Sequence, residues 1–332
     1  MKVLVTGGAG YIGSMVVAKL LERGDQVTVL DDLWFGGDAL LPFLGNRNFR
    51  LTKADIVSRN SDLDEKFFSG IDSVIHLAAI VGFPACEEAG RDKVWDVNVE
   101  GTKKIYTAAA RAGVSKLIFA SSYSSYGESK QGELVTEESQ LYPKSIYAES
   151  KIAAENFLLS QADTQITAPI CLRLATVFGV SPRTRFDLMV NQFVLEALTH
   201  GKLSIYEENY KRSFVHVRDV ARAILSVMDA PDPKVRGQVL NVGSEKLNTS
   251  KQELVAMIKA FLPDLKVAYQ ETSFMVDMRS IQVSFEKIRR VLQFEPQTDL
   301  EKGIDELIWA LQNRIIWEPT SDKYRNHSNL LS

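Results

Sequence analysis

The chain has 332 residues, a formal net charge of -3 and a hydrophobic fraction of 45%. This length is enough for one large α/β unit or for two modest domains. The charge balance lacks the excess of lysine and arginine that nucleic-acid binding needs, so we expect no nucleic-acid partner. Only two cysteines occur, which excludes a disulfide framework.

The sequence carries no apolar run of the length that a bilayer requires, and the apolar stretch before Gly7 is too short for a signal peptide. We therefore expect a cytoplasmic protein with no membrane partner. The four histidines do not have the spacing of metal ligands, so we predict no metal site.

The first half of the chain alternates short apolar runs with segments of helical periodicity. Strands are predicted at residues 2–6, 26–31, 49–53, 73–77 and 116–121 and within 166–177, and helices at 14–23, 93–112 and 147–160. This alternation predicts a Rossmann-type, doubly wound parallel sheet in an α/β fold.

After Gly179 the regular alternation of predicted strands and helices ends. Helices are expected at 186–200, 219–228 and 300–314 and strands at 203–206, 214–217 and 239–242, while Ser250 and Ser284 are expected to cap helices that end near 261 and 292. We predict an NAD-binding domain over residues 1–175 with a returning segment near 213–245. A smaller, interleaved C-terminal α/β substrate domain is predicted over 176–317, followed by an irregular tail over 318–332.

Gly7, Gly10 and Gly13 stand between the first predicted strand and the first predicted helix. Glycine allows a tight turn and lets the backbone approach a pyrophosphate, and the helix N-terminus offers unpaired amides. A glycine pattern alone is weak because turns also need glycine, but here strand, loop and helix follow in the required order. This loop, with Tyr11 and Ile12, is therefore predicted to bind a dinucleotide.

Asp31 ends the second predicted strand, and Asp32 follows it. A carboxylate at this place accepts hydrogen bonds from the adenosine ribose and repels the extra phosphate of NADP. No arginine stands beside it in the sequence, so we favour NAD; the alternative is that both aspartates only mark a turn. Further cofactor contacts are expected from residues that follow the third and fourth strands, namely Asp55, Ile56, Leu77, Ala78 and Ala79.

Tyr147 and Lys151 are four residues apart on a predicted helix and so share one face. A tyrosine with its usual pKa of about 10 is a poor base at neutral pH, but a nearby ammonium group and a positive nicotinamide ring favour the phenolate. Tyr147 is therefore predicted to take a proton from a substrate hydroxyl while hydride leaves the same carbon. Ser122 is expected to donate a hydrogen bond to the reacting oxygen, and Lys151 also to hold the nicotinamide ribose.

The pair Tyr147 and Lys151 would occur by chance on many exposed helices. It gains weight from the residues that precede it and follow it in a fixed order: 6–13, Asp31, Asp55, Ile56, 76–79, Asn98, Ser121, Ser122, 173–179 and 212–217. As a set these resemble the extended short-chain dehydrogenase/reductase family, the NAD-dependent nucleotide-sugar epimerases and dehydratases. The resemblance covers nearly the whole chain.

The resemblance implies a catalytic set of Ser122, Tyr147 and Lys151, with Asn98 and Ser121 added to the NAD site. It implies a nucleoside-diphosphate sugar as substrate, with Arg212 meeting the diphosphate. The substrate contacts that it implies are Val81, Ser122, Thr176, Arg183, Arg185, Leu188, Ser204, Tyr206 and Arg212. It also implies a homodimer, joined by a four-helix bundle that uses the helices near 93–112 and 147–160.

Departures from the family pattern reduce the number of reactions that this chain is expected to catalyse. Dehydratases of the family carry Asp-Glu after the catalytic hydroxyl residue, where this chain has Tyr123 and Ser124, and decarboxylases carry glutamate at the place of Ser124. Epimerases often have asparagine where Thr176 stands.

The stretch at 173–183, with 187–191 and 212–219, resembles a subgroup that includes GDP-heptose 4-dehydrogenases. We therefore expect oxidation at C4 of a GDP-linked heptose or hexose, by a 4-dehydrogenase or a 4-epimerase. The alternatives are a 4,6-dehydratase or decarboxylase, and a non-catalytic NAD-binding scaffold or sensor.

Overall fold

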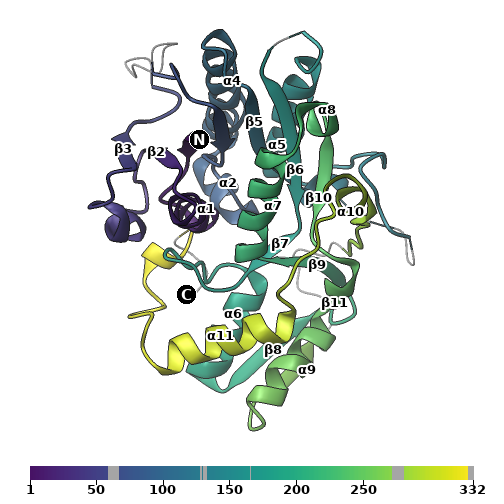
Figure 1. Cartoon of the computed structure of the whole chain (residues 1–332). Coiled ribbons are helices and arrows are strands. Elements are labelled where there is room, and N and C mark those ends of the chain that lie inside the picture. The colour runs from purple at the N-terminus through teal and green to yellow at the C-terminus, as the bar shows by residue number, and fades with distance from the viewer. Residues whose placement is uncertain (59–66, 128, 130–132, 165, 271–279, 328–332) are drawn as a thin grey trace.

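A computed structural model describes residues 1–58, 67–127, 129, 133–164, 166–270 and 280–327 (Figure 1). The main sheet of this described chain has seven strands in the order β10-β6-β5-β4-β1-β2-β3, and every neighbouring pair is parallel. The strands are β1 (Lys2–Thr6), β2 (Gln26–Asp31), β3 (Phe49–Lys53), β4 (Ser73–His76), β5 (Lys116–Ser122), β6 (Ala168–Leu174) and β10 (Val239–Val242). The predicted doubly wound α/β fold is confirmed.

Helices cover both faces of this sheet, because successive side chains of a strand point to opposite sides. Val3 and Val5 of β1 belong to the core under α1 (Tyr11–Glu22) and α7 (Val217–Asp229). Leu4 belongs to the core under α4 (Gly101–Arg111) and α5 (Ile146–Ser160). The strand order reverses between β1 and β4, which is where ligands bind in open α/β sheets.

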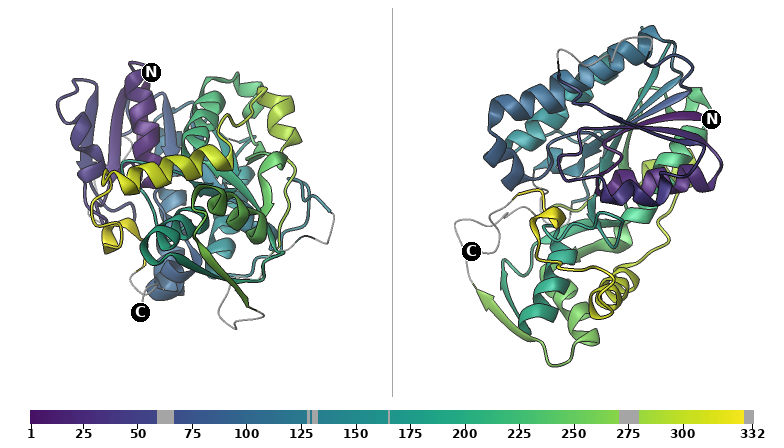
Figure 2. Two further views of the ribbon diagram at one scale, coloured as in Figure 1. Left: turned by 90° about the horizontal axis from the view of Figure 1, so that it is seen from below. Right: turned by 90° about the vertical axis from the view of Figure 1, so that its left-hand side faces the viewer.

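The second half of the chain builds a smaller layer below the carboxyl ends of the main strands (Figure 2). A sheet of β11-β9-β7 and a parallel pair of β12 and β8 pack with three helices around a separate core. These elements are β7 (Thr176–Phe178), β8 (Lys202–Tyr206), β9 (Lys211–His216), β11 (Asn248–Ser250), β12 (Lys266–Gln270), α6 (Met189–His200), α9 (Lys251–Phe261) and α11 (Leu300–Gln312). The remaining helices are α2 (Phe83–Ala89), α3 (Arg91–Trp95), α8 (Asp232–Val235) and α10 (Glu286–Leu292).

The single helix predicted over 93–112 is divided. A π-helical turn, Asp96–Glu100, separates α3 from α4. Asn98 lies in this turn and is buried: its side-chain oxygen accepts from Ile80 N, and its nitrogen donates to Ile80 O and to Ser150 Oγ.

Several predicted helix starts are wrong. Helix α1 begins at Tyr11 rather than at 14, and α7 begins at Val217 rather than at 219. Two further errors have a clear cause. Helix α6 begins at Met189 rather than at 186, because Phe186 instead donates its backbone N–H to Tyr324 O. Helix α10 is capped by Phe285, and the backbone of Ser284 donates to Val135 O beside an isolated bridge. In both places a long-range backbone bond overrides the local preference.

The tail after 318 is not irregular throughout, since Asp322–Tyr324 forms a 3-10 turn. Arg325 and His327 beyond it are buried, and residues 328–332 lie outside the described part. Among the described residues, no helix has the length and apolar character that crossing a membrane requires.

Candidate active site

A cleft of about 800 Å³ opens between the carboxyl ends of the main strands and the smaller layer. Asn98 is not among the residues that line it, because its buried side chain hydrogen-bonds to Ile80 and Ser150 instead. The other predicted site residues all line this cleft: Gly7, Gly10, Tyr11, Ile12, Gly13, Asp31, Asp32, Asp55, Ile56, Leu77, Ala78, Ala79, Val81, Ser121, Ser122, Tyr147, Lys151, Thr176, Arg183, Arg185, Leu188, Ser204, Tyr206 and Arg212.

The glycine loop is shaped by close backbone contacts. Gly7 has a φ of 72°, and a Cβ there would lie 2.7 Å from the backbone nitrogen of Ala78. A Cβ on Gly13 would overlap the carbonyl oxygen of Gly7. In the described chain no side chain caps α1, which starts at this loop, and its first turn holds no acidic residue. Its amides therefore face the cleft as a ready anion site, which fits the pyrophosphate of NAD.

The carboxylate of Asp31 joins the glycine loop to the turn that follows β2. Its Oδ2 accepts from Ala9 N at 2.9 Å, and its Oδ1 accepts from Leu33 N at 2.8 Å. Burial raises the pKa of this carboxyl, while the two backbone bonds oppose the shift. A carboxylate has about four lone-pair sites, so acceptor capacity remains for ribose hydroxyls.

No arginine stands beside Asp31 in the sequence, but one lies near it in space. Arg183, from the loop between β7 and α6, lies near enough for its charge to lower the pKa of Asp31. Its guanidinium carbon lies 3.9 Å from the ring centroid of Phe35, which follows the same strand.

Lys151 is held at the centre of the cleft wall. Its Nζ donates to Ala120 O of β5 at 2.8 Å and lies 4.6 Å from the ring centroid of Phe119. The side chain is almost completely buried, and burial lowers the pKa of Lys151 to about 8. Tyr147 lies one helical turn before it on α5 and lines the same cleft.

Hydroxyl groups surround Ser122 at the end of β5. Ser122 Oγ lies 2.8 Å from Ser124 Oγ and accepts from Ser124 N. Tyr123 Oη lies 2.7 Å from Thr176 Oγ1. Positions 123 and 124, at which the family resemblance leads us to expect the carboxylates of a dehydratase or decarboxylase, therefore hold neutral hydroxyls, Ser124 paired with Ser122 and Tyr123 with Thr176.

Arg185 enters the cleft from the loop before α6. Its Nε and Nη2 donate to the two carboxylate oxygens of Asp187 at 2.9 and 2.7 Å. This ion pair raises the pKa of Arg185 against the effect of burial, and Tyr147 adds to the rise. Asp187 is a site residue that sequence reasoning missed.

The far end of the cleft is formed by the smaller layer. Arg212 on β9 is buried, and Ser204 and Tyr206 come from β8. Lys251 donates from its Nζ to Tyr206 O at 2.7 Å and lines the same end. Two cations and a short strand edge thus face the cleft opposite the glycine loop.

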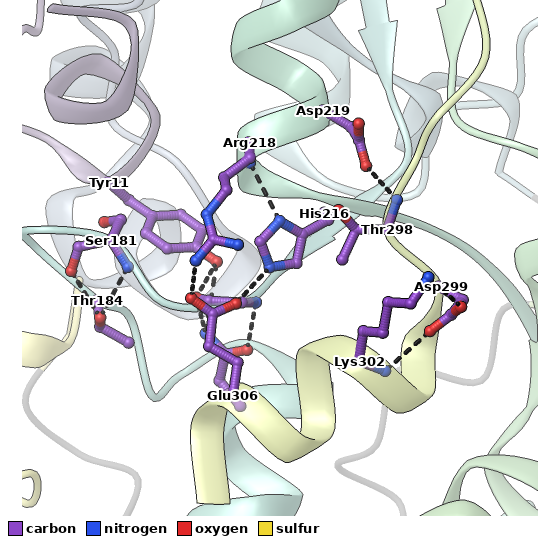
Figure 3. Close-up of polar contacts among 12 residues, drawn as sticks. Tyr11, Ser181, Thr184, His216, Arg218, Asp219, Thr298, Asp299, Lys302 and Glu306 are labelled. Carbon is purple, nitrogen blue, oxygen red and sulfur yellow. Dashed lines mark hydrogen bonds and ion pairs between the residues drawn. The ribbon is translucent and has the colours of Figure 1, made fainter. Parts of the chain in front are cut away.

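The phenol of Tyr11 points away from the cofactor loop toward the smaller layer, where it donates to Gly179 O at 2.8 Å (Figure 3). Gly179 in turn donates its N–H to Asn191 Oδ1. The imidazole of His216 packs against Gly179 and lies 3.1 Å from Glu306 of α11. This series of contacts joins the start of α1 to α11.

The family model of the "NAD dependent epimerase/dehydratase family" matches residues 3–243. The chain belongs to this family. A UDP-glucose 4-epimerase of Mycolicibacterium smegmatis is 32% identical, over 95% of this chain and 99% of its own length. A dTDP-glucose 4,6-dehydratase of Streptomyces niveus is 27% identical, over 96% and 95%. The solved dTDP-glucose 4,6-dehydratase of Streptomyces venezuelae, with NAD bound, has a TM-score of 0.83 at 28% identity over 97% of this chain and all of that one.

Family membership confirms three predictions. The protein is an enzyme of the extended short-chain dehydrogenase/reductase type, its cofactor is NAD, and its family acts on nucleotide sugars. The cleft fits the cofactor, since the uncapped helix, the glycine loop and Asp31 lie along one wall.

Proposed function

We propose that this enzyme oxidises C4 of a nucleoside-diphosphate sugar and returns the hydride to the other face of the ring, as a 4-epimerase. The observation that carries this proposal is that one cleft has the glycine loop, Asp31 and Arg212 in its lining together with Ser122, Tyr147 and Lys151. NAD supplies the hydride acceptor when bound.

In this proposal Tyr147 takes the proton of the C4 hydroxyl and later gives it back. The ammonium of Lys151 favours the phenolate, because an opposite charge nearby stabilises the ionised form. Ser122 donates a hydrogen bond to the same oxygen. The loss of the C4 hydrogen as hydride and of the hydroxyl proton to Tyr147 leaves a ketone.

The substrate in this proposal carries its diphosphate against Arg212, because a guanidinium offers a fork of donors that matches phosphate oxygens. Leu188, Ser204 and Tyr206 surround the nucleotide end of the cleft, and Val81 and Thr176 lie on the sugar side. We propose a GDP-linked heptose or hexose as substrate on the resemblance of the stretch at 173–183 to enzymes that act on GDP-heptose.

Two features favour hydride transfer at C4 over elimination, decarboxylation and a non-catalytic role. Elimination or decarboxylation needs a carboxyl group beside the reacting sugar, and Tyr123, Ser124 and Thr176 offer hydroxyls there. A scaffold or sensor needs no buried lysine one turn after the tyrosine. A 4-dehydrogenase uses the same residues but releases a keto sugar.

The test is a panel of UDP-, GDP-, dTDP- and CDP-sugars incubated with the purified enzyme and catalytic or stoichiometric NAD. We expect a new C4 stereoisomer by NMR with no lasting absorbance at the NADH band. Accumulating NADH with a keto sugar would establish the 4-dehydrogenase instead. If no sugar nucleotide is converted and none raises the melting temperature, the proposed substrate class is wrong.

We further propose a cytoplasmic homodimer that pairs α4 and α5 of each subunit in a four-helix bundle. The two helices already lie side by side, with the rings of Tyr106 and Phe157 edge to face at 5.9 Å between centroids. Light scattering in solution tests the dimer, and cell fractionation tests the location.

A further inference from the structure

Arg183 is a buried cation with only neutral partners. It is 6% exposed, and its Nη1 and Nη2 donate to Asn326 Oδ1 at 2.8 Å and to Arg325 O at 3.0 Å. In the described part of the chain its Nε has no hydrogen-bond partner, and no carboxylate forms an ion pair with it. The carboxylates of Asp31 and Asp187 lie near enough to act on its charge, but neither is among these hydrogen-bond partners. Burying an arginine without a hydrogen-bonded anion costs free energy, so this arrangement favours an anionic ligand.

The position of Arg183 points to the cofactor side of the cleft. Its guanidinium stacks on Phe35, four residues after Asp31, and both of these residues line the cleft beside the glycine loop. The anion site that family members use for the sugar nucleotide lies at the other end, around Arg212. Burial and the neighbouring Arg185 lower the pKa of Arg183 to about 10 and outweigh the opposing charges of Asp187 and Asp31.

The C-terminal tail, residues 318–327, holds this arginine in place. Besides binding Arg183, Asn326 donates its N–H to Asp187 Oδ2 and its side-chain N–H to Val81 O. Phe186 and Tyr324 pack ring to ring at 5.8 Å. In Figure 2 the yellow tail lies between the purple and blue elements of the main sheet and the green elements of the smaller layer.

We propose that Arg183 binds NAD rather than the sugar nucleotide, and that Phe35 and the C-terminal tail hold its guanidinium over the phosphate and ribose of the adenosine half. Phe35, Arg183 and Asn326 together form a clasp across the cofactor groove. The clasp slows the release of NAD, which suits an enzyme that keeps its cofactor between turnovers.

The test measures NAD binding with no sugar present, so it stands apart from the proposed reaction. Stripped full-length protein is reloaded with NAD, and binding is followed by the change in tryptophan fluorescence, to which Trp34 in the cleft contributes. Retention of NAD through gel filtration reports its release. We compare Arg183→Gln with Arg290→Gln, a matched control at an exposed arginine of α10.

We expect Arg183→Gln to raise the Kd for NAD by about tenfold or more, as the loss of a charge-assisted hydrogen bond does, with Arg290→Gln unchanged. Asn326→Ala should raise it several-fold, and the double variant should be no worse than Arg183→Gln alone, because Asn326 acts through Arg183. Unchanged NAD binding by Arg183→Gln, with weaker binding of free UDP or GDP, would overturn the proposal.

A second variant guards against misfolding of Arg183→Gln, which circular dichroism detects. Phe35→Leu keeps the cation and removes the ring that it stacks on. We expect faster NAD release from this variant, because cation–π contact at a buried site is lost. Wild-type release by a folded Phe35→Leu protein would refute the clasp.

Discussion

Arg185 and Asp187, two residues apart in the loop before α6, form a two-point ion pair with both side chains nearly out of contact with solvent. Removing one partner of such a pair leaves an uncompensated charge, which costs far more than a surface pair contributes. The loop that carries Arg183 into the cleft therefore depends on this contact.

Asp187→Asn should lower the free energy of unfolding by about 3 kcal/mol, because it leaves Arg185 buried without a counter-charge. The matched control is Asp232→Asn, whose carboxylate pairs with Arg236 on the surface and should cost less than about 1 kcal/mol. Urea unfolding followed by circular dichroism measures both. Equal losses of unfolding free energy in the two variants would show that the Arg185–Asp187 pair contributes no more to stability than a surface ion pair.

Tyr147→Phe should reduce kcat by about 10²- to 10⁴-fold, because the variant keeps the ring but has no group to take the proton. NAD should still bind with its wild-type affinity. Tyr142→Phe, at an exposed tyrosine, provides the control and should leave kcat unchanged. The measurement is initial rate on the sugar that the panel identifies, and wild-type turnover by Tyr147→Phe would exclude this residue as the base.

Gly179→Ala should destabilise the protein by more than about 3 kcal/mol, the range typical of overpacking and backbone strain combined. Gly179 has a φ of 104°, and an added Cβ would overlap the imidazole of His216. Gly201 separates the two effects, because its φ is 62° with no atom near the added Cβ, and Gly201→Ala should cost about 1 kcal/mol. Thermal unfolding of both variants checks this, and similar melting temperatures would contradict it.

His76 should make the protein less stable in acid. Thr6 Oγ1 accepts from Leu77 N and Ala78 N and lies 2.7 Å from His76 Nδ1, so its hydroxyl donates to that nitrogen. Thr102 Oγ1, which donates to Asn98 O, accepts from Nε2. Both ring nitrogens are satisfied in the neutral form. Burial lowers the pKa of His76 from 6.5 to about 3, and the charge of Lys151 adds to this.

Because the folded pKa lies below the unfolded one, the unfolded state binds the extra proton first. The contribution of neutral His76 to the free energy of unfolding is therefore fully present above pH 6.5. It falls by about 1.4 kcal/mol per pH unit as the pH drops toward 3. His76→Gln, which does not titrate, should show a shallower fall than wild type in urea unfolding between pH 6.5 and 4. His200→Gln, at an exposed histidine, should not. Parallel curves for wild type and His76→Gln would count against this account.

Local sequence patterns were sufficient for the sheet and for much of the cofactor side of the cleft, whereas the substrate-side residues were expected from the family resemblance. Strand, glycine loop and helix are contiguous in the chain, and Tyr147 and Lys151 need only helical geometry to share a face. Such relations extend over a few residues, so a single sequence expresses them directly.

The parts that were missed depend on distant contacts. Phe35, Asp187 and Asn326 carry no local pattern that indicates a site. Phe35 contacts Arg183, and Asn326 of the tail contacts both Arg183 and Asp187. Asn98 was expected in the cofactor site, yet the π turn directs it to Ile80 behind the wall. The side chain of Arg183 reaches the Asp31 side of the cleft from the loop before α6, which no reading along the chain would reveal.

The contact between Asn326 and Val81 joins positions 245 residues apart. A chain still attached to the ribosome can form all seven strands of the main sheet before this contact exists, since β10 ends at Val242. The wall of the cleft around Val81 is therefore completed only after the main sheet. A chain that stops between Val242 and Asn326 contains every strand of the main sheet but lacks this contact.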